Sequence, residues 1–388
     1  MTFRAACVKC FNLTQCSRQA QDIETKEKSM SYSSRFVQGT ALVLMGSTSA
    51  YAGGFATARF GGERGHAATD HLTAIYYNPA GLAHGEGTRG AVEGLLAYRT
   101  VDYDRDPAAI DNRGTGTPED GVAANAGPAK LRNLLASPFV GVATDAGVEG
   151  LGLGLGFYAP FGGQASWEPN VTYRNNPSYP GAVDGTQRWA AISGHQRTIY
   201  ITAGAAWASP KKSVAFGAGL NVISSDLALV RARNATGTDD LVNPDGSVAE
   251  GRSLLEAKDL TVGVGLGAMW SPSPRMRLGI GYQSMPGFGD MTLEGTLTNK
   301  FGANPETAVD VVLLQRMPDV LRVSAELGVS ETLVLRFAAD WQRWSKYKNQ
   351  CLLPAEETNQ SCTFHPDGSL DPAAGGAGTV IVNLPRDW

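Results

Sequence analysis

Most of the chain alternates between large apolar residues and small or polar ones with a period of two. In residues 151–157 the odd positions carry leucine or phenylalanine and the even positions carry only glycine, and residues 214–222 and 262–270 alternate in the same way. In residues 333–342 an apolar face opposes a face that carries Arg336 and Asp340. A period of two is typical of β-strands with one apolar face. The pattern therefore predicts an all-β protein.

The connections between these strands differ in length and alternate along the chain. Four are short and contain Gly, Pro or Ser, and lie at residues 145–149, 209–213, 271–275 and 328–331. Five are long and polar, and are expected near residues 103–131, 163–194, 233–256, 287–316 and 346–377. A soluble β-sandwich also alternates, but short turns on one rim and long loops on the other favour an antiparallel transmembrane outer-membrane β-barrel. Trp207 and Trp270 each precede a Ser-Pro turn, where an interfacial aromatic girdle is expected.

The beginning of the chain predicts export. Residues 30–52 combine a short polar start, an apolar stretch and an Ala-Tyr-Ala ending, which is typical of a secretory signal peptide cut after Ala52. Residues 1–29 are polar and carry three cysteines, at positions 7, 10 and 16. A start assigned too early, with Met30 the true start, explains them most simply. The alternative is a genuine zinc-binding or lipidated extension, although no fourth ligand lies at zinc spacing.

Charge and cysteine content restrict the classes of function. Six of the 33 basic and three of the 37 acidic residues precede Gly53, so the rest of the chain has a net charge of about −7, and no nucleic-acid partner is expected. No further apolar run approaches the roughly 20 residues that a spanning helix needs. Beyond the signal peptide the cysteines are Cys351 and Cys362, which form either a disulfide or two free thiols.

No motif predicts catalysis, a cofactor or a metal site. The glycine repeats alternate within strands instead of turning into a helix, so they are interpreted as small residues facing a lumen and not as a nucleotide-binding loop. The histidines show no metal-ligand spacing, and no Gly-x-Ser-x-Gly elbow is present. The protein is expected not to be an enzyme.

One strand carries an irregularity. Residues 157–163 place Pro160 and two glycines where the backbone hydrogen bonds of the strand should continue. Proline removes a donor, and an unpaired backbone group facing lipid is costly unless protein covers it or it lines a passage. The residues alone leave two interpretations: Pro160 ends the strand as it leaves the membrane, or it marks an opening in the wall.

Several short motifs follow one another between Gly53 and Trp388. They are Gly53-Gly-Phe55, Asp70 with Asn78-Pro79-Ala80, Tyr158-Ala-Pro-Phe-Gly162 with Trp167, Met317-Pro-Asp319, Asp340-Trp-Gln-Arg-Trp-Ser-Lys-Tyr347 and Leu384-Pro-Arg-Asp-Trp388. In this order the motifs resemble those of the outer-membrane transporters for long-chain fatty acids and other hydrophobic compounds, the FadL/TodX type.

The resemblance implies a barrel of about fourteen strands whose N-terminal segment folds inside as a hatch. Residues 53–85 would be the hatch, residues 86–388 the barrel strands, and Asn78, Pro79 and Ala80 the gating residues. The family's ligand leaves sideways through a gap where the third strand kinks. That kink would comprise Pro160, Phe161 and Gly162, at the irregularity described above.

The implied function is passive uptake of long-chain fatty acids or similar hydrophobic molecules. By alternation Arg197, Arg322 and Arg336 are candidate lumen residues for a carboxylate, or part of an ordinary charge ladder. The expected partners are the hydrophobic ligand, outer-membrane lipid and lipopolysaccharide, and the barrel assembly machinery, with the protein a monomer. The alternatives are an aromatic hydrocarbon channel and a general porin or adhesion barrel.

The end of the sequence departs from the family. About ten strands are expected before the chain stops at Trp388, where relatives continue through several more. Pro385 and Arg386 also interrupt the apolar alternation of a barrel C-terminus. A truncated record is the preferred interpretation, and a natural smaller barrel is the alternative.

Overall fold

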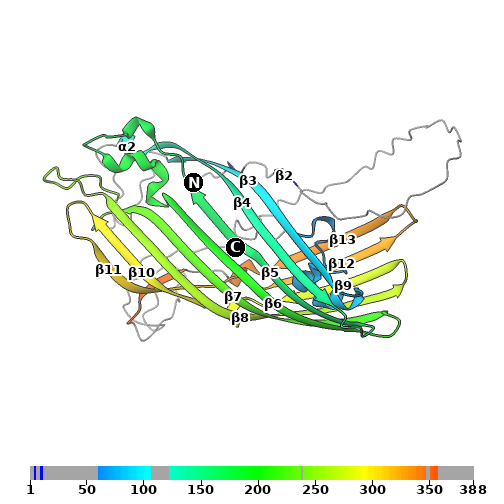
Figure 1. The fold of residues 1–388 in the computed structure, drawn as a ribbon. Helices are drawn as coiled ribbons and strands as arrows, with labels where there is room; N and C mark the ends of the chain where they lie inside the picture. The colour runs from blue at the N-terminus through cyan, green and yellow to red at the C-terminus, as the bar shows by residue number, and fades with distance from the viewer. Residues whose placement is uncertain are drawn as a thin grey trace, which may run out of the picture.

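A computed structural model describes residues 4–5, 9–11, 60–105, 122–236, 239–346 and 350–356, which form one strongly curved antiparallel sheet (Figure 1). Six long strands of 16 to 23 residues come first and pair in chain order. They are β3 (Arg89–Arg105), β4 (Gly127–Thr144), β5 (Leu151–Ser166), β6 (Ser193–Ala208), β7 (Val214–Arg233) and β8 (Gly251–Ser273). Because about ten residues cross a bilayer, these strands extend well beyond it.

The later strands are shorter and divide the sheet into two branches. They are β9 (Met276–Gln283), β10 (Met291–Phe301), β11 (Thr307–Gln315), β12 (Val320–Gly328), β13 (Val334–Gln342) and β14 (Cys351–Pro354). One end of β8 pairs with β9 and the other with β10. The first branch continues through β12 to β13, and the second through β11 to β14. Among the described residues, no pairing joins β13 or β14 to β3.

The prediction of a long polar loop over residues 287–316 was wrong. This segment forms the hairpin of β10 and β11, in which Leu293 lies opposite Leu313. Its alternation of apolar residues was present in the sequence but is interrupted on both sides by proline, at Pro286 and Pro318. Proline cannot donate a hydrogen bond to a neighbouring strand. Accordingly, Pro286 lies between β9 and β10, and Pro318 lies between β11 and β12.

The remaining elements are short. The helical turns are η1 (Gly62–Arg64), α1 (Ala74–Tyr77), η2 (Pro79–His84), α2 (Val122–Asn125), η3 (Val171–Tyr173), η4 (Pro180–Asp184), η5 (Thr186–Trp189), η6 (Pro286–Phe288) and η7 (Trp344–Lys346). Two small strands, β1 (Arg4–Ala5) and β2 (Lys9–Phe11), pair with β3. None of the described helices is long and apolar enough to cross a membrane.

The two faces of the sheet differ as the alternation predicted. The convex face exposes aliphatic side chains, including Leu155 (57% exposed) and Leu220 (56%). The concave face carries buried residues such as Tyr158 and Tyr200. A band of exposed hydrocarbon on one face is what a lipid-facing wall requires.

The two ends of the sheet also differ, as predicted. The turns between β4 and β5, β6 and β7, β8 and β9, and β12 and β13 are short and lie together at one end (Figure 1). Beside these turns Trp207, Phe216 and Trp270 are exposed on the convex face, as expected of an interfacial girdle.

The opposite end carries the long connections, and a buried arginine joins three of them. Arg188 is fully buried and makes a bidentate pair with Glu250, at 2.9 and 3.0 Å. It also donates to the side chain of Asn125 (2.7 Å) and to the carbonyl of Ala124 (2.9 Å). Since a buried ion pair is tolerated only when its remaining donors are satisfied, this network fixes α2, η5 and the end of the β7–β8 connection to one another.

Candidate functional site

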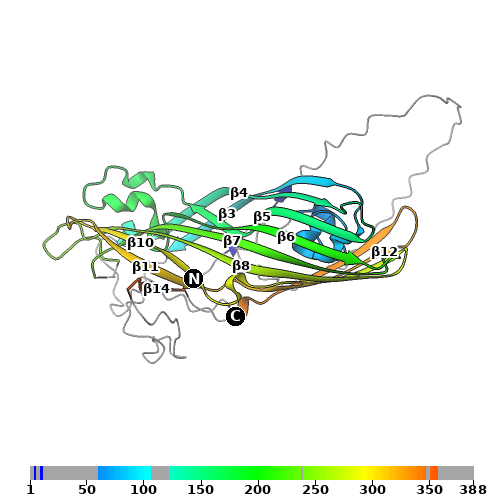
Figure 2. The same cartoon turned by 60° about the horizontal axis from the view of Figure 1, so that its bottom comes forward.

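Residues 60–85, here called the inner segment, lie within the curve of the sheet near the short-turn end (Figures 1 and 2). Most of the segment from residue 66 to residue 83 is buried. The segment is rich in alanine and in aromatic residues, and its two short helical turns meet at Asn78. It therefore packs as an internal plug against strands β5 to β9.

The Asn78-Pro79-Ala80 element is held by one amide side chain. Asn78 is fully buried and its backbone is extended, which ends α1 and allows Pro79 to begin η2. Its Oδ1 accepts from the backbone N–H of Ala80 (3.1 Å), and its Nδ2 donates to the carbonyls of Ala67 (2.5 Å) and Ala268 (3.0 Å). An amide supplies both an acceptor and two donors, so asparagine closes the turn and attaches it to β8.

Glycines of the sheet leave room for this turn. A Cβ atom at Gly267 would lie 1.8 Å from Oδ1 of Asn78, and one at Gly217 would lie 2.4 Å from the backbone nitrogen of Ala80. A Cβ at Gly281 would lie 2.1 Å from the carbonyl oxygen of Tyr77. The glycines predicted only as small lumen-facing residues thus allow the backbone of the inner segment to lie directly against the wall.

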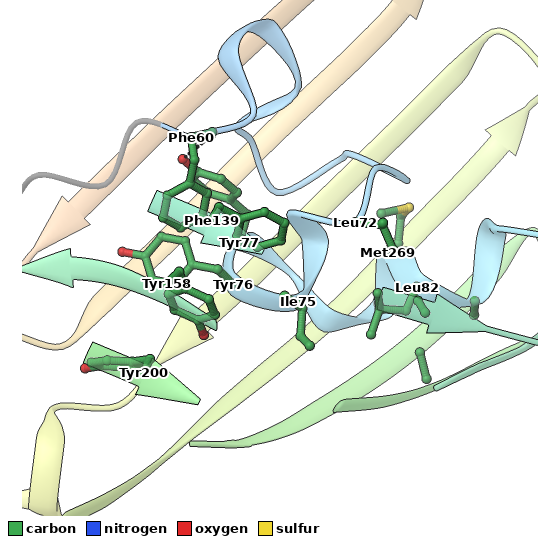
Figure 3. Packing of buried hydrophobic residues seen from close by; sticks show 14 of the residues in the cluster. Phe60, Leu72, Ile75, Tyr76, Tyr77, Leu82, Phe139, Tyr158, Tyr200 and Met269 are labelled. Carbon is green, nitrogen blue, oxygen red and sulfur yellow. Dashed lines mark hydrogen bonds between the residues drawn. The ribbon is translucent and has the colours of Figure 1, made fainter. Parts of the chain in front are cut away.

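An aromatic cluster joins the inner segment to the wall (Figure 3). Phe60 stacks on Phe139 of β4 with ring centroids 5.0 Å apart, and Tyr76 contacts Tyr158 of β5 edge-on at 5.1 Å. Tyr158 in turn contacts Tyr200 of β6 at 5.6 Å. Such contacts contribute beyond the burial of area, so aromatic packing ties the inner segment to β4 and β5 and, through Tyr158, to β6.

Beside this cluster the hydrogen bonding between β4 and β5 stops. The two strands pair from Thr144 with Leu153 up to Phe139 with Tyr158. Beyond that, the backbone pairing described between them is a single bridge, from Leu131 to Trp167. The wall is therefore interrupted over several residues of each strand.

The predicted kink residues lie at this interruption. The pairing of β5 with β6 shifts between Tyr158 and Phe161, so that Ala159 and Pro160 together oppose Ile199. An extra residue of this kind is a β-bulge, which bends the strand. Phe161 is buried, and Gly162 pairs with Arg197 immediately after the bulge.

A cavity of about 750 Å³ occupies the interruption. Leu134, Pro138 and Phe157 line it from the convex side, and Leu135 and Phe161 line it from the concave side. Residues of both faces of the sheet thus meet in one largely apolar space.

Charged pairs attach the inner segment to the wall at the short-turn end. Asp70 pairs with Arg277 of β9 (3.1 Å), and its carbonyl accepts from Arg89 of β3 (3.0 Å). His71 lies 3.4 Å from Glu93, again on β3. Burial by itself would raise the pKa of Asp70, but the Arg277 guanidinium outweighs this and holds that pKa below its ordinary value.

Burial lowers the pKa of three histidines of the inner segment. Burial lowers the pKa of His66 and of His71, although Glu326 and Glu93 act against the shift. Burial, together with the nearby Arg277, lowers the pKa of His84 to about 4. Protonation of these histidines is therefore less favourable while the inner segment is packed against the wall than it is in a free side chain.

Arg322 contacts the inner segment. It is almost fully buried, its guanidinium lies 4.1 Å from the ring centroid of Tyr76, and it donates to the Tyr76 carbonyl at 3.2 Å. Arg336 pairs with Glu326 (2.8 Å) and with Glu63 of the segment (3.6 Å). The structure thus places both predicted ligand arginines in contacts with protein.

The prediction that Arg197 faces the lumen was wrong. It lies on the convex face with its side chain 61% exposed and pairs with Asp226 at 3.0 Å. Tyr200 and Thr202 of the same strand are fully buried on the concave face. Alternation from these two residues necessarily places Arg197 outside.

The aromatic cluster and the partners of Asp70 were missed by the sequence analysis. Adjacent tyrosines at 76 and 77, so close to the Asn-Pro-Ala motif, were the available signal for the cluster. Nothing in the sequence relates Arg277 to Asp70, more than 200 residues away.

One of the two predicted disulfide cysteines lies in the described part of the chain. Cys351 is buried and disulfide-bonded, while Cys362 lies outside the described residues. The predicted signal peptide, residues 30–52, lies outside them as well, as does the upstream extension apart from residues 4–5 and 9–11. In the part of the chain that the structure describes, no three His, Cys, Asp or Glu residues are grouped as metal ligands.

Comparison with known proteins identifies relatives of this arrangement. A family model described as outer membrane protein transport protein (OMPP1/FadL/TodX) matches residues 43–367. A FadL homologue from Pseudomonas aeruginosa, 16% identical, aligns over 81% of this chain and 69% of its own with a TM-score of 0.52. The toluene transporter TbuX from Ralstonia pickettii, 18% identical, aligns over 82% and 75% with a TM-score of 0.51.

A comparison with curated proteins found no significant match. The two solved structures are similar in fold, and the family model extends over most of the sequence. The chain therefore belongs to the FadL/TodX family of Gram-negative outer-membrane proteins, which transport hydrophobic compounds.

Proposed function

We propose that this protein takes up long-chain fatty acids by passive diffusion and releases them sideways into the bilayer, without catalysis. The observation that carries the proposal is the interruption between β4 and β5, where residues of both faces line one apolar cavity. At the interruption the β5 carbonyls of Ala159 and Gln164 accept from side chains, of Ser137 and of Asn133 and Arg99, instead of from the β4 backbone. A lipid-facing wall without regular backbone pairing is costly. A passage for apolar molecules gives this cost a function.

The inner segment acts as the hatch in this proposal. Asn78, Pro79 and Ala80 keep it against the wall, and the segment blocks the direct route along the lumen toward the short turns. Phe161 belongs to the same buried cluster as the aromatic residues of the hatch, and it also lines the cavity beside β5. An apolar molecule that reaches the aromatic cluster can therefore pass into that cavity.

Hydrophobic transfer supplies the driving force. Moving a CH₂ group from water to an apolar surrounding is favourable by about 0.8 kcal/mol, so a long acyl chain is drawn from water into the lumen and then into lipid. No coupled energy source is needed when the ligand moves down its gradient.

Uptake of aromatic hydrocarbons is the second candidate. TbuX is a toluene transporter, and the aromatic cluster at the hatch would suit a ring as well as a chain. The two candidates differ in the polar end of the ligand, which only the fatty acid has.

The proposal is tested by deleting Pro160. The deletion removes the extra residue and leaves Phe161 in regular register opposite Thr198, so that β5 can pair with β4 across the interruption. Cells without such a transporter of their own would carry either protein, and uptake of labelled oleate and labelled toluene would be measured. We expect loss of most uptake from a protein that still inserts and resists protease.

Pro160→Ala is the matched control, because it keeps the extra residue and should keep most of the uptake. Full uptake by the deletion variant would contradict lateral release. Uptake of toluene alone by the unchanged protein would move the assignment to hydrocarbons, and uptake of neither from folded protein would refute the transport function.

A further inference from the structure

Charged side chains of alternating sign cross the convex face of the sheet in one row. Four residues lie directly opposite one another on neighbouring strands, namely Arg197 of β6, Asp226 of β7, Lys258 of β8 and Glu294 of β10. Residues that lie directly opposite each other share a face of the sheet. These four residues are here called the charged row.

The charged row marks the outer boundary of the lipid-facing band. Between the row and the aromatic residues beside the short turns, the convex face of the described strands β6, β7 and β8 carries no charged residue. Trp207 lies ten residues from Arg197 along β6. This is about 33 Å of strand and, at a tilt of roughly 40°, about 25 Å across the membrane, which is the height of the apolar band of an outer-membrane barrel. Because the short turns of such barrels are periplasmic, Arg197 lies at the level of the outer lipid headgroups.

Arg197 and His195 also line the cavity at the interruption between β4 and β5. Apolar side chains, among them Phe157 and Phe161, line much of the rest of that cavity. Phe161 belongs to the buried cluster of the hatch. The cavity therefore extends from this cluster to the level of the outer headgroups.

One carboxylate holds the two polar side chains at the mouth of the cavity. Nη2 of Arg197 donates to Oδ2 of Asp226 at 3.0 Å, and Nε2 of His195 lies 2.7 Å from the same oxygen. A guanidinium has five N–H donors, and beyond Asp226 and His195 no described residue accepts from Arg197. Its side chain is 61% exposed, so its remaining donors are open to a ligand.

We propose that Arg197, positioned by Asp226 and accompanied by His195, binds the carboxylate of a fatty acid that leaves through the cavity into lipid. This inference rests on the proposed function and adds the orientation of the released ligand. The carboxylate stays at the level of the outer headgroups while the chain enters the hydrocarbon. A ligand with one anionic end and an apolar chain complements both the guanidinium and the apolar lining, whereas toluene complements only the lining.

The charges at the mouth favour a carboxylate over the phosphate of a resident lipid. Asp226 already offsets the charge of Arg197, so a phosphate with more than one negative charge would be repelled more strongly than a carboxylate with one. A carboxylate can also take two parallel hydrogen bonds from the guanidinium.

The test locates both ends of the ligand on the full-length protein. Two C18 fatty acids carry a photoreactive diazirine, one beside the carboxylate and the other at the chain end, and labelled positions are mapped by mass spectrometry after illumination of outer membranes. We expect the carboxyl-end probe to label β6 and β7 around Arg197 and Asp226, and the chain-end probe to label the apolar lining. Arg197→Gln should reduce the carboxyl-end labelling about fivefold, as expected for the loss of one exposed ion pair.

Three further variants separate a binding role from a structural one. Arg197→Lys should keep most of the carboxyl-end labelling, and Asp226→Asn should increase it, because the competing carboxylate is gone. Lys258→Gln is the matched control, since Lys258 belongs to the charged row but does not line the cavity, and it should leave the labelling unchanged. The methyl ester of the carboxyl-end probe should label the cavity equally in every variant.

Three results would overturn the assignment. One is carboxyl-end labelling that persists in Arg197→Gln, and another is an equal loss for the acid and its methyl ester, which indicates a structural role. The third is a phosphate-bearing lipid that copurifies with the unchanged protein but not with Arg197→Gln, since it would identify the bound anion as lipid phosphate. If the unchanged protein takes up neither oleate nor toluene, the proposed function fails instead.

Discussion

Two halves of the same concave wall differ in the size of their side chains. Near the short turns β7 and β8 present Gly217 and Gly267, and the hatch backbone lies directly against them. Toward the long connections the same strands present Leu229 and Leu255, followed by Arg231. The wall therefore carries glycine where the hatch backbone lies against it and buried aliphatic side chains toward the long connections.

The two halves also differ in the kind of contact that their side chains make. Around the hatch, Asp70 and Arg322 have partners from another part of the chain, so the polar groups hold protein to protein. In the other half the buried cluster consists of apolar side chains, among them Leu255 and Leu293. A polar network whose groups are satisfied fixes the position of the hatch against the wall.

Adding one methyl group at Gly267 should have the largest effect, and the effect should be confined to the half of the wall that holds the hatch. In Gly267→Ala the Cβ would overlap Oδ1 of Asn78, so the Asn78 turn must leave the wall. We expect the hatch to lose about 4 kcal/mol, from overpacking and from the lost hydrogen bonds. Limited proteolysis within residues 60–85 in detergent measures this.

Gly94→Ala is the control for that substitution, since no atom lies within 4 Å of its added Cβ. It should leave the protease resistance of the hatch unchanged. Equal resistance of Gly267→Ala and the unchanged protein would contradict the proposed role of the glycines.

Asn78→Ala should have a somewhat smaller effect. It removes the acceptor for Ala80 and the donor for the carbonyls of Ala67 and Ala268. Leaving buried groups unpaired costs about 3 kcal/mol in total, and proteolysis of the hatch should rise accordingly. Asn78→Asp should be damaged as well, because it keeps the acceptor but loses both donors. A hatch as resistant as the original in both variants would show that this side chain does not hold it.

Acidification should have the smallest effect. The pKa of His84 is lowered to about 4 in the seated hatch, against an ordinary value near 6.5. The released state therefore binds more protons between these values, so the seated hatch loses stability as the pH falls from about 6.5 toward 4. The lowered pKa values of His66 and His71 act in the same direction.

Asp70 does not contribute in that window, because its pKa is lowered and its stabilisation is lost only at more acidic pH. Protease sensitivity of the hatch should thus be greater at pH 5 than at pH 7.5, and His84→Gln should reduce the difference. A hatch that is more resistant at pH 5 would contradict this sign.

Local patterns were sufficient for the fold class. Alternation in residues 151–157 and the short turns predicted antiparallel strands correctly, because the two faces of a strand and the residues of a tight turn are neighbours in sequence. The hairpin of β10 and β11 was missed, since Pro286 and Pro318 interrupt a pattern that continues in space.

Register and long-range contact required the folded chain. Alternation says that Arg197 and Tyr200 face opposite ways but not which of them faces inward, and the pairing of the strands and the position of the hatch settle this. The spacing of Asn78, Gly267 and Arg322 likewise carries no sign that they meet. Strand identity is encoded in neighbouring residues, whereas the contacts of the site join residues about 200 positions apart through the curvature of the sheet.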